Sequence, residues 1–237
     1  NLKECNRKGL AILIDPDNLS TLLLKTQVEL AVTNKVDFFF IGGSMITNDC
    51  LDETLEFIKS KCDIPTILFP GSIYQVSKKA DAVLFLSLTS GRNAELLIGK
   101  HVEAAPMVKA SGIEVIPTGY LLIDSGVQTT ASYMSNSTPI PHNKPNIAAV
   151  TAMAGEMLGL KLIFMDGGSG AQNPISEEMI TTVGKSVDTP LIIGGGISSG
   201  EKAAANCKAG ADIIVVGNAI EKNENLIIEI ANAVHNC

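Results

Sequence analysis

Three glycine-rich turns in the last third of the chain have the composition of a phosphate-binding site. Each follows an apolar run: residues 164–171 read FMDGGSGA, residues 194–197 read GGGI, and Gly217-Asn218 follows the last run. Because glycine has no Cβ, such turns expose backbone N–H groups, and a helix behind them adds a partial positive charge. Three such turns side by side predict a binding site for the phosphate of a small ester.

A single turn of this kind is equally well explained as the end of a strand. The pair at 194–196 and 217–218 lies one strand–helix unit apart. Barrels commonly hold a phosphate between the loops after strands seven and eight and a short extra helix. The spacing therefore favours a phosphate site, with Asn218 in the first turn of that helix.

Polar side chains also follow the first two apolar runs. Asp15, in Asp15-Pro-Asp17, is expected to hold a hard cation such as Mg2+, which binds oxygen ligands and bridges to substrate phosphates. Asp17 is expected to cap the next helix. Ser44, after Gly42 and Gly43, is a candidate second contact of the metal or of a diphosphate.

Asp166 is the candidate general base, since it faces the space where the rest of a bound phosphate ester would lie. The alternative is a carboxylate that only accepts hydrogen bonds from loop amides. Ser169, three residues further on, is expected to offer the ligand a hydroxyl or an amide.

The elements that must position these residues alternate along the chain. Strands are predicted over 10–14, 38–41, 66–69, 82–87, 114–116 continuing into 120–123, 160–165, 191–193 and 213–216. Helices are predicted over 19–34, 51–60, 73–79, 101–111, 147–158, 177–186, 201–209 and 226–234. Most strand runs are continuously apolar, which is typical of a parallel sheet buried on both faces.

Eight such units predict an α/β fold of one domain over residues 1–237, a (β/α)8 TIM barrel. A doubly wound open sheet is the alternative, but it usually carries one dominant glycine loop after its first strand. The segment 125–146 is rich in Ser, Thr, Asn and Pro and has no clear periodicity. It is predicted to be a long mobile segment over the catalytic face.

Composition and charge argue against several classes of binding partner. A net charge of −7 with no basic stripe argues against nucleic acid. The apolar runs are far shorter than the roughly 20 residues of a membrane span, and we expect neither a membrane anchor nor a signal peptide. The five cysteines are scattered and odd in number, which indicates reduced thiols in a cytoplasmic protein. The three histidines are scattered too, which argues against zinc.

The order of these motifs resembles the geranylgeranylglyceryl phosphate synthase family, which includes the bacterial heptaprenylglyceryl phosphate synthases. The resemblance spans nearly the whole chain. It rests on IDPD at 14–17, IGGS at 41–44, LFPG at 68–71, IGKH at 98–101, DGGSGA at 166–171, GGGI at 194–197 and VGN at 216–218. Each glycine turn alone is unspecific, whereas the order and spacing of all of them are specific.

The resemblance implies a barrel that alkylates sn-glycerol 1-phosphate with a polyprenyl diphosphate, geranylgeranyl diphosphate in our interpretation. It implies Mg2+ at Asp15 and Ser44. It implies that glycerol phosphate contacts Phe164, Met165, Asp166, Gly167, Gly168, Ser169, Gly170, Gly195, Gly196, Gly217 and Asn218.

Three positions depart from the commoner archaeal pattern. Phe164 stands where tyrosine is typical, Asp166 where glutamate is frequent, and Leu13 where a lysine is often found. These departures resemble the second subgroup, with archaeal and Bacteroidetes members, and imply a homo-oligomer, either a dimer or a hexamer.

The predicted reaction divides the labour between the two aspartates. Asp15 with its metal serves the departing diphosphate, and Asp166 takes the proton of the attacking glycerol hydroxyl. Candidate walls of the prenyl groove lie at 84–88, 96–98 and 120–123, with Tyr133 and Met134 on the segment 125–146. For any single one of these residues, ordinary core and helix packing is the favoured interpretation. Two alternatives remain: another phosphate-binding barrel enzyme, an isomerase or lyase, and a non-catalytic binder of phosphate ligands.

Overall fold

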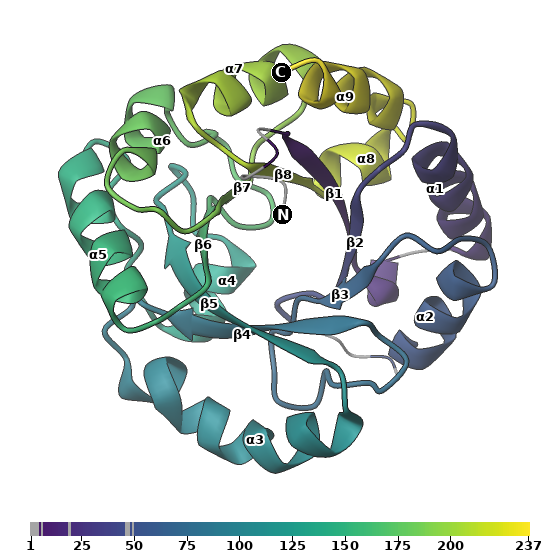
Figure 1. Cartoon of the computed structure of the whole chain (residues 1–237), viewed down its shortest axis with the longest axis horizontal. Helices are drawn as coiled ribbons and strands as arrows, with labels where there is room; N and C mark the ends of the chain where they lie inside the picture. The colour runs from purple at the N-terminus through teal and green to yellow at the C-terminus, as the bar shows by residue number, and fades with distance from the viewer. Residues whose placement is uncertain (1–4, 6, 19, 46–47, 49) are drawn as a thin grey trace.

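The computed structural model describes residues 5, 7–18, 20–45, 48 and 50–237. Within this part of the chain, eight parallel strands pair in sequence order and close into a barrel, as predicted (Figure 1). The strands are β1 (Gly9–Ile14), β2 (Phe38–Ile41), β3 (Thr66–Leu68), β4 (Ala82–Leu88), β5 (Glu114–Leu122), β6 (Leu162–Asp166), β7 (Leu191–Gly194) and β8 (Ile213–Val216).

The helices surround the barrel. They are the 3-10 helix η1 (Pro16–Asn18), α1 (Thr21–Thr33), α2 (Leu51–Lys59), the π-helix η2 (Glu95–Gly99), α3 (Lys100–Ser111), α4 (Thr130–Ser135), α5 (Pro145–Met157), α6 (Glu177–Gly184), α7 (Gly200–Ala209), α8 (Asn218–Lys222) and α9 (Leu226–His235). Leu19, the predicted start of the first helix, lies outside the described residues.

Two hydrophobic layers account for the continuously apolar strands. Alternate side chains of a strand point to opposite faces, so each strand fills both layers. The outer layer packs the strands against the helices. The inner layer fills the barrel and contains Phe40, Leu84, Tyr120, Phe164 and Ile192 among its members.

Three aspartates secure the amino-terminal end of the barrel in the same way. Each lies just before a strand and accepts a hydrogen bond from the first or second residue of the preceding strand. Asp37 accepts from the Leu10 amide at 2.9 Å, Asp81 from the Thr66 amide at 2.8 Å, and Asp212 from the Leu191 amide at 3.0 Å. These carboxylates satisfy strand N–H groups that begin the ladder.

The helix predicted over 73–79 is wrong. Only loop connects β3 to β4, and Figure 1 shows it between α2 and α3. Buried polar side chains hold this loop instead. Gln75 accepts from the Gly71 amide at 3.0 Å and donates to the Gly43 carbonyl at 3.2 Å, and Ser77 donates to Asp52 at 2.5 Å. These tertiary bonds outweigh a short apolar periodicity.

Two further predictions are corrected. The sequence predicts a break at 117–119 between two strand segments, but β5 is continuous through these residues. The segment 125–146 contains regular structure: Thr129 and Ser132 form a capping box that starts α4, and Ile140 bridges Ile123. Its Ser and Thr residues act as caps rather than as markers of irregular chain. The mobility of this segment stays a prediction.

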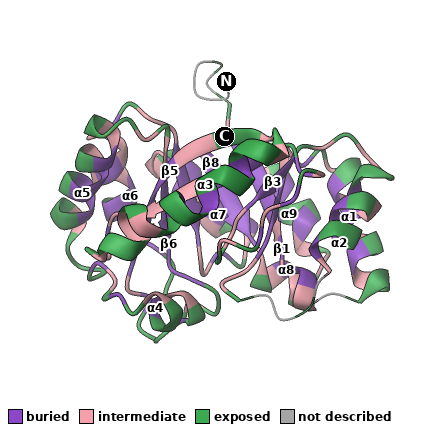
Figure 2. Ribbon diagram, turned by 90° about the horizontal axis from the view of Figure 1, so that it is seen from below, coloured by how far each residue is buried: buried purple, intermediate pink, exposed green. Residues whose placement is uncertain are grey.

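The two ends of the barrel differ. The strands begin at one end, where the aspartates secure them, and α4 and α8 lie at the other end (Figure 2). In barrels of this kind the carboxyl ends of the strands carry the functional groups, so the site is built at the end marked by α4 and α8.

Candidate functional site

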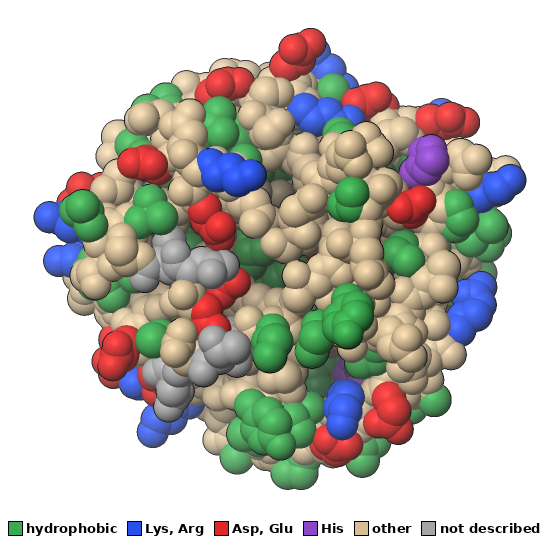
Figure 3. All heavy atoms as spheres, turned by 180° about the vertical axis from the view of Figure 1, so that it is seen from behind, with side chains coloured by type: hydrophobic (Ala, Val, Ile, Leu, Met, Phe, Trp, Pro, Cys, Tyr) green, Lys and Arg blue, Asp and Glu red, His purple; other side chains and the backbone are tan. Residues whose placement is uncertain are grey.

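A pocket of about 950 Å³ opens at the carboxyl ends of the strands. Figure 3 views this end and shows a central hollow with apolar side chains at its floor and Asp and Glu at its rim. Nearly all predicted site residues line it: Asp15, Ser44, Phe164, Asp166, Gly168, Ser169, Gly170, Gly195, Gly196, Gly217 and Asn218. Residues from five different strands, or from the turns that follow them, therefore converge on one space.

Met165 and Gly167 do not line the pocket. Strand alternation explains Met165, because Phe164 and Asp166 point inward and the Met165 side chain is fully buried in the outer layer. The Gly167 amide donates to the Gly194 carbonyl at 3.2 Å, which joins the turns after β6 and β7. Both residues shape the turn rather than face the pocket.

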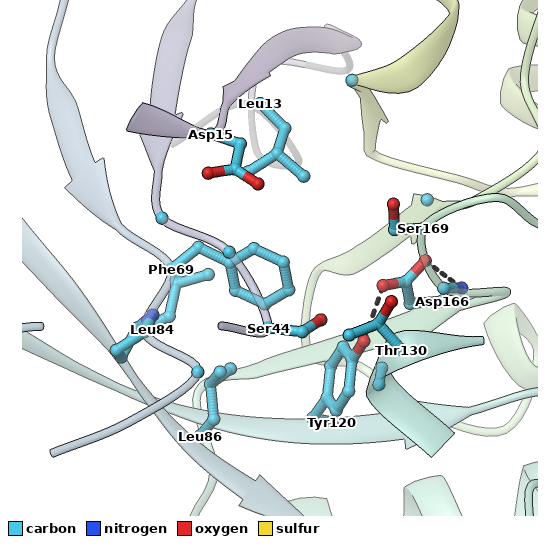
Figure 4. A pocket seen from close by; sticks show the side chains of 18 of the residues that line it. Leu13, Asp15, Ser44, Phe69, Leu84, Leu86, Tyr120, Thr130, Asp166 and Ser169 are labelled. Carbon is cyan, nitrogen blue, oxygen red and sulfur yellow. Dashed lines mark hydrogen bonds between the residues drawn. The ribbon is translucent and has the colours of Figure 1, made fainter. Parts of the chain in front are cut away.

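Asp166 ends β6 and is fixed on both sides. Its Oδ2 accepts a hydrogen bond from the Tyr120 hydroxyl at 2.6 Å, and its Oδ1 accepts from the Gly168 amide at 2.8 Å. Figure 4 shows both bonds and the Thr130 side chain from α4 beside the carboxylate. Burial raises the pKa of Asp166 above its usual range, and the bonds from Tyr120 and Gly168 oppose that rise. Such a carboxyl group is suited to proton transfer.

The turns after β6, β7 and β8 lie against one another. Gly195 has φ +83°, and a Cβ added there would lie 2.5 Å from the Gly167 amide nitrogen, so only glycine fits. The Ser169 hydroxyl donates to Asn218 Oδ1 at 3.1 Å, which joins the turns after β6 and β8. Gly168 lies directly against Thr129, the N-cap of α4. Turns from three strand ends thus border one side of the pocket.

Asp15 lies on the opposite side of the pocket from Asp166 and Ser169 (Figure 4). Its Oδ1 accepts from the Asp17 amide at 3.1 Å. Burial raises its pKa, the Asp17 amide opposes this, and the Asp17 charge adds to it. Asp17 itself accepts from the Asn48 amide at 3.1 Å and lines the pocket, whereas Ser20 caps α1, so the predicted capping role of Asp17 is wrong.

The residues around Asp15 fit a cation that keeps part of its shell. A Cβ on Gly43 would lie 3.0 Å from Asp15 Oδ2, so any larger residue at position 43 would crowd the carboxylate. Ser44 follows directly and its hydroxyl faces the pocket (Figure 4). No three His, Cys, Asp or Glu side chains among the described residues are grouped to hold a metal. Mg2+ needs no such cage, because it is commonly bound through one or two carboxylates with waters and substrate phosphates.

Sequence reasoning missed two polar residues of the pocket. Tyr120 was expected only as a groove wall, yet its hydroxyl bonds Asp166. Glu221, on α8, lines the pocket, and burial and the charge of Asp15 raise its pKa. Its place one turn after Gly217 was the signal available for it.

Two of the three departures from the commoner pattern are also located. Leu13 lines the pocket and packs against Gly217, where a Cβ would lie 3.3 Å from the Leu13 Cβ. Phe164 is 1% exposed inside the barrel, and its ring stacks on Phe69 at 5.2 Å and meets Tyr120 edge-on at 5.4 Å. Both departures are therefore apolar side chains, Leu13 against the turn after β8 and Phe164 inside the barrel.

An apolar arm leads from the pocket into the gap left by the missing helix. It is lined by Val76 of the β3–β4 loop, Val83 and Phe85 of β4, and Ala104 and Val108 of α3. Of the predicted walls, Leu84, Leu86, Leu88, Leu96, Tyr120, Leu122 and Met134 line the pocket. Ile98 and Tyr133 are 60% and 69% exposed and belong to the outer surface.

Comparisons with known proteins find the same kind of relative over nearly the whole chain. A family model described as the PcrB family matches residues 4–234. The geranylgeranylglyceryl phosphate synthase of Chitinophaga pinensis is 58% identical over 228 residues, 96% of this chain and 90% of that protein. The synthase of the same name from Pyrococcus furiosus is 43% identical over 211 residues, 89% of this chain and 83% of that protein.

A solved structure agrees with these relatives. The crystal structure of (S)-3-O-geranylgeranylglyceryl phosphate synthase from Thermoplasma acidophilum, in complex with substrate sn-glycerol-1-phosphate, has a TM-score of 0.93 at 33% identity. It covers 99% of this chain and 96% of its own. Within the described residues, none of the helices is sufficiently long and apolar to span a membrane.

Proposed function

Because the chain belongs to the PcrB family and is a prenyltransferase, we propose that it joins geranylgeranyl diphosphate to the hydroxyl of sn-glycerol 1-phosphate. The family resemblance and the prenyltransferase class, both predicted from the motifs, are confirmed. The proposed acceptor follows the relative whose structure contains sn-glycerol-1-phosphate, and the proposed donor follows the names of the relatives.

One observation carries the proposal: a single pocket joins a polar side, a second carboxylate and an apolar arm. Asp166 and the glycine turns form the polar side, Asp15 lies opposite, and the arm runs between the β3–β4 loop and α3. An acceptor phosphate, a departing diphosphate and a hydrocarbon tail each find matching chemistry there.

At the acceptor side, backbone amides and Ser169 hold the phosphate of glycerol 1-phosphate. Asp166 accepts the proton of the glycerol hydroxyl as its oxygen attacks C1 of the donor. The bond between C1 and the diphosphate oxygen breaks, and its electron pair leaves with the diphosphate. The new carbon–oxygen bond is an ether, so the product is a prenylglyceryl phosphate.

At the donor side, Asp15 and Ser44 hold Mg2+. The ion, when bound, supplies positive charge that favours departure of the diphosphate. The hydrocarbon tail lies in the apolar arm, because burying each CH2 group contributes about 0.8 kcal/mol.

The test is incubation with labelled geranylgeranyl diphosphate, sn-glycerol 1-phosphate and Mg2+, followed by extraction of the prenyl ether. We expect product only when all three are present. Asp15→Ala should abolish turnover while calorimetry finds acceptor affinity nearly intact. No ether from a donor of any chain length would overturn the proposal. Conversion of another phosphate ester would favour an isomerase or lyase, and binding without turnover would favour a phosphate-ligand binder.

The chain is also proposed to assemble with itself, as a dimer or hexamer. Helix α5 and its C-cap Leu158 support this with uncovered apolar side chains: Ile147, Val150, Met157 and Leu158 are 41%, 56%, 83% and 80% exposed. Light scattering during gel filtration gives the mass directly. A monomer at micromolar concentration would contradict this part of the proposal.

A further inference from the structure

Tyr120 is held more tightly than a groove wall requires. It lies on β5 in register with Phe164 of β6, and its ring meets Phe69 at 5.8 Å and Phe164 at 5.4 Å, both edge-on. The side chain is 9% exposed, and its hydroxyl reaches Asp166 Oδ2 at 2.6 Å. Two aromatic rings and one carboxylate therefore fix the direction of the hydroxyl.

We propose that Tyr120 is the positioning residue for the general base: its hydroxyl holds the Asp166 carboxylate facing the pocket and favours its ionised form. The inference rests on the proposed function of Asp166. It assigns Tyr120 to the base rather than to the hydrocarbon tail, although the ring still lines the pocket.

The direction of the hydrogen bond supports this role. Burial and the nearby Asp166 charge raise the pKa of Tyr120 well above its usual value, so the phenol keeps its proton and donates. Asp166 accepts this bond through Oδ2 and the Gly168 bond through Oδ1. With one donor on each oxygen, rotation of the carboxylate would break both bonds, and the remaining lone pairs are left for the substrate proton.

The other charged groups of the pocket lie away from this pair. Tyr120 is the titratable side chain that bonds Asp166, and β6 and β7 present backbone groups to it. The causes that shift the Asp166 pKa are burial, Tyr120 and the Gly168 amide. Among the described residues, the other titratable side chains that line the pocket are Asp15, Asp17, Lys100, His101, Glu103, Glu221 and Lys222. These groups are the same in the wild type and in a Tyr120 variant, so the difference between the two pH profiles reports the Asp166–Tyr120 pair.

Tyr120→Phe tests the proposal, with Tyr133→Phe as the matched control because Tyr133 is 69% exposed. Activity rises with pH as Asp166 ionises, and loss of the phenol removes a donor that favours ionisation. The acidic limb of kcat/KM should move to higher pH. On the alkaline plateau kcat should stay about tenfold or more below the wild type, the usual weight of a hydrogen bond to a charged group. KM for glycerol 1-phosphate should change little.

The outcomes separate this inference from the proposed function. Absence of prenyl ether from the wild type would overturn the proposed function itself. A wild type that forms ether, with Tyr120→Phe matching its kcat and pH profile, would overturn only the role of Tyr120. A rise confined to KM for the acceptor would also overturn it, since Tyr120 would then bind substrate instead.

A second variant keeps the test valid if Tyr120→Phe fails to fold. In a Tyr74→Phe, Tyr133→Phe background, Tyr120 is the remaining tyrosine of the chain. Global incorporation of 3-fluorotyrosine then makes that phenol a stronger donor with almost the same shape. The acidic limb should move to lower pH, the opposite direction from Tyr120→Phe. An unchanged limb would overturn the proposal.

Discussion

Asp166 is a carboxylate whose charge the fold makes costly. It is 8% exposed, and burial raises its pKa while Tyr120 and the Gly168 amide only partly offset the rise. Perturbed carboxyl groups of this kind gather at functional sites, because proton transfer near neutral pH needs them. Activity and stability therefore make opposite demands on this residue.

Asp166→Asn should separate the two demands. The amide keeps the shape but accepts no proton, so turnover should fall about 100-fold or more. A raised folded-state pKa stabilises the fold most at low pH, and that contribution is lost as pH rises through the folded pKa. Relative to the variant, the wild type should therefore lose free energy of unfolding as pH increases.

Chemical denaturation at several pH values measures that difference, and exposed Glu178→Gln is the matched control. A difference between wild type and Asp166→Asn that stays constant across pH would contradict the burial argument. A variant with wild-type turnover would contradict the role of Asp166 as base.

The amino-acid sequence alone predicts the position of some of these residues but not of others. Asp15 and Asp166 end apolar runs beside glycine, so local pattern suffices to predict their place at the mouth of a barrel. Tyr120 lies 46 residues from Asp166. Their contact depends on β5 and β6 being neighbours in register, which no local pattern contains. Met165 was misplaced for a local reason, since strand alternation turns it away from the pocket.

The elements at the amino-terminal end carry stability without touching the site. Asp212 accepts from the Leu191 amide at 3.0 Å and pairs with Lys8 at 3.2 Å, and both side chains are largely buried. Asp37 and Asp81 serve β1 and β3 in the same manner. These bonds lie at the end of the barrel opposite the pocket, so we expect the reaction not to depend on them.

Asp212→Ala should therefore destabilise the barrel and leave catalysis alone. It removes the acceptor of a strand amide and leaves the Lys8 charge nearly buried, at a cost of roughly 3 kcal/mol. Thermal unfolding should shift down by about 6–12 °C for a chain of this size. Exposed Asp63→Ala, at the same end, is the control. A changed kcat at 25 °C in the folded variant would show that the two ends are coupled.

Helices and strands are predicted correctly where buried apolar residues recur along the chain. The prediction fails where a single polar side chain determines the local structure. Eight apolar strand runs were enough to predict the barrel. The loop at 73–79 has a short apolar periodicity, but Gln75 bonds Gly71 and Gly43 across the barrel mouth. A side-chain bond to a distant turn cannot be read from spacing, so the missing helix was not foreseen.

At the scale of the whole molecule, the gap between α2 and α3 sets the shape of the pocket. Ala104 lies on the α3 side of the apolar arm and is 7% exposed, whereas the next residue, Ala105, is exposed to solvent. Replacing either alanine by Phe gives a helix of the same composition, but only the change at Ala104 fills one side of the arm.

Ala104→Phe should obstruct the arm for long donors. Losing contact with two or three methylene groups corresponds to about tenfold or more in affinity. KM for geranylgeranyl diphosphate should rise by that factor, while KM for geranyl diphosphate and for glycerol 1-phosphate stays near the wild-type value. Ala105→Phe should leave all three unchanged. Equal effects on short and long donors would place the tail elsewhere.

The absent helix between β3 and β4 has a consequence for the place of the donor. Val83 and Phe85 point outward from β4 into the gap, as strand residues elsewhere do toward a covering helix. Protein already covers Val83, which is 1% exposed, and His101 of α3 meets the Phe85 ring edge-on at 4.4 Å. Under the proposed function, the hydrocarbon tail of the donor would therefore lie beside these residues, in the place where the other strand–helix units of the barrel have a helix.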